Sequence, residues 1–114
     1  MNFIHIRIVR NRRAENEDDL ITIFPDNQSG FLVTYKDGLT TKTKNQFNCT
    51  PSDAVEYVYS VLDLIQIDED PFEIIQFDLP GYPSIMLTIK NLKATTIRRL
   101  MYVVRNVIYN WPFN

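Results

Sequence analysis

The chain has very little of what catalytic and metal sites are usually built from. Its 114 residues include one cysteine, one histidine and three glycines. A single cysteine, Cys49, cannot form an internal disulfide, so we expect a cytoplasmic or otherwise intracellular setting. Three glycines are too few for a phosphate-cradling loop, and no P-loop or G-x-S-x-G motif occurs. The sequence therefore predicts a protein that is not an enzyme, with no cofactor and no metal.

A strong charge of one sign and a long apolar run are also lacking. The net charge is −2, which argues against a protein that coats nucleic acid with its whole surface. No run approaches the roughly 18 to 20 apolar residues of a membrane span, so we expect no membrane insertion. With 45% hydrophobic and 23% charged residues, the chain can bury a core. We expect a single domain over residues 1–114.

Alternating apolar residues predict six strands. They cover residues 3–9, 20–24, 31–36, 39–44, 72–78 and 84–90. Asp37 and Gly38 favour a two-residue type I′ hairpin turn, which would place Lys42 beside Val33 on the next strand. Residues 10–19 show no apolar periodicity, and we interpret them as a solvated loop.

Two helices complete the pattern. Thr50 is a good N-cap for a helix that begins at Pro51 and ends near residue 67. The second helix covers about 94–111, where Pro112 would stop it. The order ββββ-α-ββ-α predicts an α+β fold, with a mostly antiparallel sheet and both helices packed on one face.

The polar faces of the two helices are the sharpest surface features. On the second helix, Arg98, Tyr102, Arg105 and Tyr109 recur at helical spacing and form one stripe. The outer face of the first helix carries Glu56, Tyr59 and Asp63. Tyrosine and arginine are enriched at interface hot spots, so these stripes indicate a protein partner or self-association. Solvated faces, or two neighbours paired within one fold, are the alternatives that the sequence leaves open.

Local arginine clusters support a second hypothesis, a nucleic-acid-binding module. The candidate residues are Arg10, Arg12, Arg13, Arg98 and Arg99. Phosphate contacts need clustered Lys and Arg side chains, and neighbouring aromatic rings would help to stack bases.

A third hypothesis is a small ligand-binding or enzymatic site near Cys49 or the loop "LPGYP". Residues 79–82 fit a type II turn, with Pro80 at the second position and Gly81 at the third. Tyr82 would then lie at a stiff, exposed tip, and it is the residue of this loop that would recognise a partner.

The stretch "DPFEIIQFDLPGYPSIML", followed by a helix that ends in "WP", gives the second half of the chain a resemblance. It is similar to small uncharacterised proteins of large, AT-rich DNA viruses, and the Ile- and Asn-rich composition is compatible with them. The resemblance implies a structural role in a virion, in assembly or in host interaction, and it assigns no role to any residue. We therefore predict a non-enzymatic interaction or assembly protein that acts through its helix faces.

Overall fold

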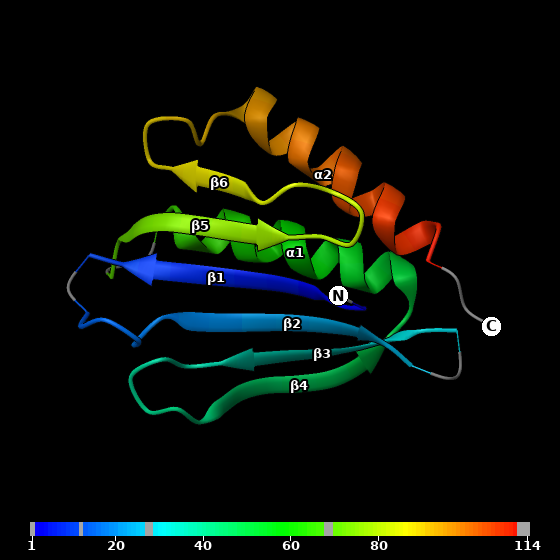
Figure 1. Ribbon diagram of the computed structural model, residues 1–114, viewed down its shortest axis with the longest axis horizontal. Helices are drawn as coiled ribbons and strands as arrows, with labels where there is room; N and C mark the ends of the chain where they lie inside the picture. The colour runs from blue at the N-terminus through cyan, green and yellow to red at the C-terminus, as the bar shows by residue number, and fades with distance from the viewer. Residues whose placement is uncertain (1, 12, 27–28, 68–69, 112–114) are drawn as a thin grey trace.

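A computed structural model describes residues 2–11, 13–26, 29–67 and 70–111 (Figure 1). It confirms the α+β fold and the element order ββββ-α-ββ-α. The elements are β1 (Ile4–Arg10), β2 (Asp19–Pro25), β3 (Phe31–Lys36), β4 (Thr43–Cys49), α1 (Pro51–Ile65), β5 (Phe72–Asp78), β6 (Ile85–Thr88) and α2 (Ala94–Tyr109). In the described ranges, no helix is both long and apolar enough to cross a membrane.

The six strands form one antiparallel sheet in the order β4-β3-β2-β1-β5-β6. Strand β1 lies near the middle, between β2 and β5. The first four strands follow one another as antiparallel neighbours. Strand β5 returns to the other side of β1 after α1. The prediction that β5 is apolar on both faces is wrong, because an irregularity in the β1–β5 register places Phe72, Ile75 and Phe77 together on the buried face, while Gln76 and Asp78 are only half-buried.

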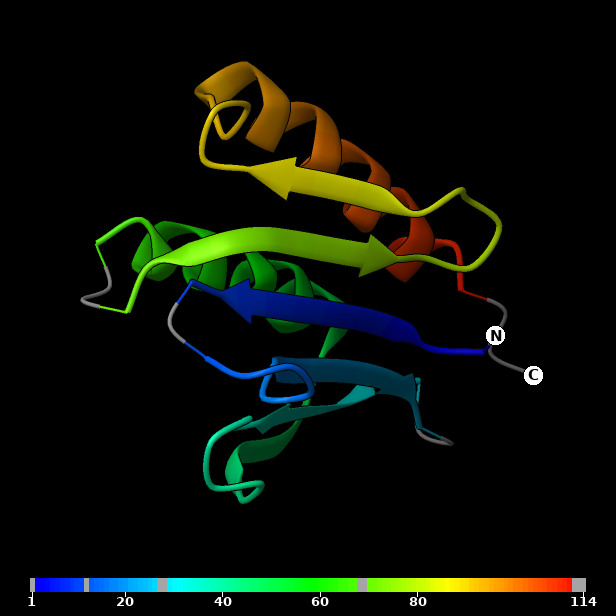
Figure 2. The ribbon, with the colours of Figure 1, turned by 60° about the vertical axis from the view of Figure 1, so that its left-hand side comes forward.

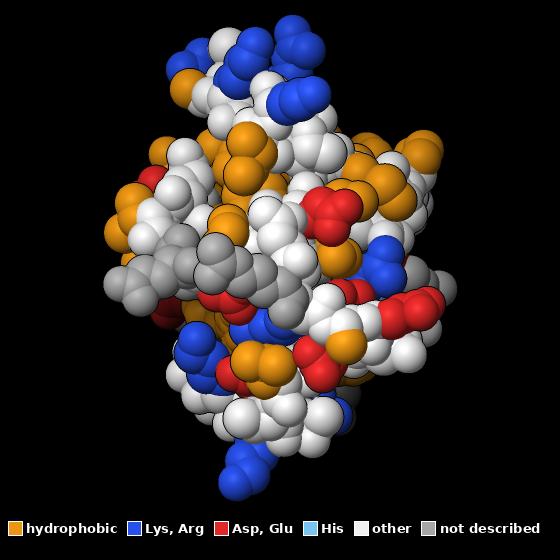
Figure 3. All heavy atoms as spheres, turned by 90° about the vertical axis from the view of Figure 1, so that its left-hand side faces the viewer, with side chains coloured by type: hydrophobic (Ala, Val, Ile, Leu, Met, Phe, Trp, Pro, Cys, Tyr) orange, Lys and Arg blue, Asp and Glu red, His pale blue; other side chains and the backbone are white. Residues whose placement is uncertain are grey.

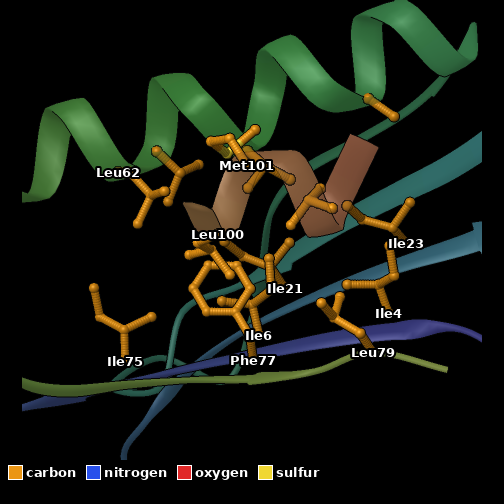
Figure 4. Packing of buried hydrophobic residues seen from close by; sticks show 14 of the residues in the cluster. Ile4, Ile6, Ile21, Ile23, Leu62, Ile75, Phe77, Leu79, Leu100 and Met101 are labelled. Carbon is orange, nitrogen blue, oxygen red and sulfur yellow. The ribbon is translucent and has the colours of Figure 1, made fainter. Parts of the chain in front are cut away.

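The core lies between one face of the sheet and the two helices (Figure 2). Every second residue of the inner strands is buried, as the alternation Ile4, Ile6, Ile8 on β1 predicts. Figure 4 shows Leu62 of α1 meeting Met101 of α2 above the side chains of the sheet. The helices are amphipathic, and their buried stripes are Ala54, Val55, Val58, Val61, Leu62 and Ile65 on α1, and Leu100, Met101, Val104, Val107 and Ile108 on α2.

Thr50 caps α1 as expected, because its hydroxyl accepts a hydrogen bond from the Asp53 backbone N–H at 3.2 Å. The type II turn at residues 79–82 is also confirmed. The backbone N–H of Tyr82 donates to Leu79 O at 3.1 Å, and Gly81 has a φ of 81°.

The predicted two-residue turn at Asp37–Gly38 is wrong. Strand β4 begins at Thr43, and the backbone N–H of Asp37 bonds to Lys42 O across a longer loop. The observed register pairs Val33 with Phe47, so an aromatic ring lies toward the core where the predicted register would have placed Lys42. Burial of Phe47 against Tyr57 of α1 gives the longer loop its advantage over the tighter turn.

Gly38 is needed for a close approach between two loops. A Cβ atom at this position would lie 2.1 Å from the backbone oxygen of Glu17 in the β1–β2 connection. The Gly38 N–H also donates to the carboxylate of Asp19 at 2.9 Å. The loops after β1 and β3 therefore pack backbone to backbone at one end of the sheet.

We predict that Gly38→Ala lowers the free energy of unfolding by about 2–4 kcal/mol, because the methyl group forces the two loops apart. Gly81→Ala is the matched comparison: a Cβ there meets no atom within 4 Å, and only the positive φ is unfavourable. Its expected cost is about 1–2 kcal/mol. Urea unfolding followed by circular dichroism measures both, and an equal or smaller loss for Gly38→Ala would contradict the close-approach argument.

Candidate functional site

The two helices run antiparallel and in contact across the outside of the sheet (Figures 1 and 2). Helix α1 begins one residue after β4 and ends at the opposite end of the sheet, where β5 starts. Helix α2 begins at that same opposite end, after β6, and returns. The polar stripes predicted on the two helices are therefore brought side by side.

A groove of about 720 Å³ separates these stripes on the outer surface of the helix layer. Its floor is apolar and consists mainly of Val55, Ile97 and Met101. Its rim is polar and aromatic. The rim residues are Glu56, Tyr59, Asp63 and Gln66 on α1, and Arg98, Tyr102 and Arg105 on α2.

The groove takes in residues 55–66 of α1 and 94–105 of α2, which are stretches of equal length. Both helices have the same rise per residue and run antiparallel. The N-terminal part of one therefore lies beside the C-terminal part of the other. Glu56 thus shares one end of the groove with Arg105, and Asp63 shares the other end with Arg98. Each end carries one acidic and one basic wall.

The four charged side chains of the groove are exposed. Over the described residues, none of Glu56, Asp63, Arg98 and Arg105 forms an ion pair. The stripes are therefore neighbours within one fold, but their charged groups do not pair directly with each other.

The tyrosines of the stripes differ in position. Tyr59 and Tyr102 are 52% and 68% exposed at the rim, which makes them the large apolar surfaces nearest the groove floor. Tyr109 is also exposed, but it lies a turn beyond Arg105 and outside the groove lining.

The predicted solvated loop at residues 10–19 is wrong at both of its ends. Arg10 ends β1 and Asp19 begins β2, and both side chains are buried. Arg10 Nε donates to Asp19 Oδ2 at 3.2 Å, and Arg13 Nη1 donates to Asp19 Oδ1 at 2.5 Å. Arg13 also reaches Asp70 Oδ2 at 2.9 Å. Arg10 and Arg13 thus bind carboxylates of the chain itself. The third arginine of the predicted cluster, Arg12, lies outside the described residues.

Asp19 is the centre of this buried network. Besides the two guanidinium groups, it accepts hydrogen bonds from the Tyr35 hydroxyl and the Gly38 N–H, each at 2.9 Å. Burial opposes ionisation of Asp19, but the Gly38, Arg13 and Tyr35 hydrogen bonds outweigh it and hold its pKa below the ordinary value. Burial and the Asp19 charge in turn raise the pKa of Tyr35. The network is a structural ion cluster, with its polar atoms mutually satisfied.

Tyr82 lies in a second, smaller hollow of about 470 Å³ beside the end of α2. Its polar lining is neutral, from Asn2, Asn106 and Asn110, and Trp111 and Pro80 supply apolar surface. Among the described residues that line it, Tyr82 is the one ionisable side chain. Residues 112–114, which follow Trp111 directly, are outside the described part of the chain.

Cys49 and His5 do not form a catalytic pair. Cys49 ends β4 at the sheet edge, three strands away from β1, and its register partner Phe31 places it on the helix-covered face. His5 lies on the opposite face. Burial, with the nearby charges of Asp53 and Asp26, raises the pKa of the Cys49 thiol, which opposes thiolate formation. Among the described residues, no three His, Cys, Asp or Glu side chains gather in a metal-binding arrangement.

Comparison with known proteins finds no family model, no curated protein and no solved structure that matches this chain. The resemblance to small proteins of large DNA viruses stays a prediction.

Two features of the site were missed from the sequence. The apolar groove floor could not be predicted, because Val55, Ile97 and Met101 fit the spacing of a core-facing helix stripe equally well. The buried network was missed although alternation pointed to it. Arg10 has the same parity as Ile4, Ile6 and Ile8, and Asp19 the same parity as Ile21 and Ile23, so both face the core.

We predict that Asp19→Asn lowers the free energy of unfolding by about 3–5 kcal/mol, because it leaves two guanidinium groups without their buried counter-charge. Asp63→Asn is the matched control, since Asp63 is exposed and forms no ion pair with any described residue, and its effect should stay within about 0.5 kcal/mol. Chemical denaturation at neutral pH measures both variants. A loss for Asp19→Asn no larger than that of the control would show that the network does not stabilise the fold.

The same carboxylate predicts an acid dependence. The pKa of Asp19 is lower in the folded chain than in the unfolded chain, where it is about 3.9. The stabilisation is therefore present above pH 4 and is lost as the pH falls through the lower folded-state value. Unfolding free energies measured from about pH 7 to pH 2.5 should fall more steeply for the wild type than for Asp19→Asn. Parallel pH profiles would overturn this assignment.

Proposed function

We propose that this chain is a non-enzymatic interaction or assembly protein, and that the groove between α1 and α2 is its protein-binding surface. The observation that carries the proposal is the set of exposed, complementary charges on the groove walls, which find no ionic partner within the described residues. Charges of this kind become favourable when a partner presents the opposite pattern.

The uncovered face of the sheet supports this choice by contrast. Two of its charged clusters are already partnered: Arg7 donates to Gln76 at 2.8 Å and lies 3.5 Å from Asp18. His5 lies 3.8 Å from Asp78, which also accepts hydrogen bonds from Gln76. A partner on that face would have to displace contacts that the fold has already made.

The groove also has the anatomy of a binding surface. Protein interfaces combine an apolar centre with a polar rim, and tyrosine and arginine carry much of the binding energy. Here Val55, Ile97 and Met101 form the centre, and Tyr59 and Tyr102 stand at the rim. The rings are already exposed, so a partner can bury them without rearranging the core.

The nucleic-acid hypothesis has weaker support. Two of its five candidate residues, Arg10 and Arg13, are held in the buried network. The remaining basic cluster lies where α2 begins, with Lys93, Arg98 and Arg99, and Figure 3 shows Lys and Arg side chains gathered at that end of the molecule. Arg98 also faces the groove, so this small cluster favours nucleic acid less than the groove favours protein.

A photo-crosslinking amino acid in place of Tyr102 tests the proposed function. The matched control carries the same group in place of Met86, which is 53% exposed on the uncovered face of the sheet. We expect discrete covalent protein adducts, with another copy or with another protein, from position 102 and few or none from position 86. The adducts should disappear when Arg105→Glu is added. Equal adducts from both positions, or none from either, would contradict a binding role for the groove.

A further inference from the structure

We propose that the occupant of the groove is a second copy of this chain, packed face to face about a two-fold axis that runs along the groove. The inference rests on the proposed function and specifies its partner. It is carried by the self-complementary charge pattern, with an acidic wall on α1 and a basic wall on α2 of the same groove. A surface that presents both halves of a complementary pattern can satisfy itself in an isologous dimer.

The axis along the groove brings opposite charges together. A half-turn about this line exchanges left and right across the groove but leaves each position along it unchanged. Helix α1 of one copy then lies over α2 of the other. Glu56 meets Arg105 of the other copy, and Asp63 meets Arg98 of the other copy, since each of these pairs shares an end of the groove. Symmetry repeats both contacts, which gives four ion pairs.

The competing two-fold axis, across the groove, brings like charges together. A half-turn about that line keeps α1 over α1 and reverses its direction. Glu56 would then lie over Asp63 of the other copy, and Arg98 over Arg105. Like charges in contact oppose association, so the charge pattern selects the axis along the groove.

The aromatic rim fits the same arrangement. Tyr59 and Tyr102 lie midway along the groove, on opposite walls. Rotation about the groove axis places Tyr59 of one copy over Tyr102 of the other, twice. The four rings would cover the apolar floor formed by Val55, Ile97 and Met101 and remove it from water.

The size of the helix layer sets the expected affinity. Helices of 15 and 16 residues are about 23 Å long, and packed axes lie roughly 10 Å apart. The face is therefore roughly 20 Å by 23 Å, at the small end for specific interfaces. We expect a reversible dimer with a dissociation constant in the micromolar range, about 1–100 µM.

Charge reversal tests the axis directly, by sedimentation equilibrium from about 1 µM to about 1 mM protein. The first variant is Arg98→Glu with Arg105→Glu, and the second is Glu56→Lys with Asp63→Lys. Each variant alone should dimerise on the order of 100-fold more weakly, because four attractive pairs become repulsive. An equimolar mixture of the two should associate again, since the acidic walls of one then meet the basic walls of the other.

A matched control is Lys93→Glu with Arg99→Glu. It makes the same change in net charge on an exposed part of α2 and the residue before it, outside the groove. This control should dimerise within about threefold of the wild type. Tyr102→Ser removes an aromatic ring from the proposed interface without changing the charge. It should weaken the dimer about tenfold. Circular dichroism confirms that each variant is folded before its association is measured.

The outcomes separate this inference from the proposed function. Weaker association of each variant alone, with restored association in the mixture and an unaffected control, supports the two-fold along the groove. The axis across the groove already brings like charges together in the wild type, so charge reversal would not weaken a dimer built about it. A wild type that stays monomeric to about 1 mM overturns it, and so does a dimer in which the two charge-reversed variants fail to rescue each other. If the wild type is monomeric while the crosslinker at position 102 captures a different protein, the groove binds protein but its partner is not a second copy. If the wild type is monomeric and position 102 gives no specific adducts, both the dimer and the protein-binding role of the groove are contradicted.

Discussion

The carboxylate of Asp19 holds together three connections at one end of the sheet. It binds Arg10 and Arg13 from the β1–β2 connection, and Tyr35 and Gly38 from β3 and the loop after it. Arg13 extends the network to Asp70, before β5. A buried carboxylate is tolerated only when its charge and lone pairs are matched, so these connections have one arrangement that satisfies them together. The Gly38 N–H reaches Asp19 from the loop after β3, so this network adds to the burial of Phe47 in favouring the longer loop.

The helix layer is built on the apolar face of this sheet. The four inner strands present a continuous apolar face, which α1 and α2 cover. The apolar stripes of the two helices pack against the sheet and against each other, as Figure 4 shows. Their polar stripes are left on the outside with the groove between them. The proposed binding surface thus consists of the helix faces that do not contribute to the core.

Local signals predicted most of the fold. Apolar runs located five of the six strands, and Thr50 and Pro51 located the start of α1, whereas the fourth strand lies at Thr43–Cys49 and not at the predicted 39–44. The failures occurred where local and distant preferences disagree. Asp37–Gly38 has a strong tendency to form a tight turn, but contacts with Glu17 and Asp19, and the burial of Phe47, override it. Arginines in a polar segment are expected to face solvent or to bind phosphate groups. Only the folded position of Asp19 shows that Arg10 and Arg13 bind a carboxylate within the chain.

The sequence by itself determined which residues share a helix face, because the helical period depends on spacing alone. It therefore determined the stripe of Arg98, Tyr102 and Arg105, and the stripe of Glu56, Tyr59 and Asp63. Only the tertiary structure decided that the two stripes face one groove in antiparallel order, without an ion pair between their four charged side chains. The reason is that the distance and direction between two helices depend on the sheet that both cover, and that sheet joins residues far apart in the chain.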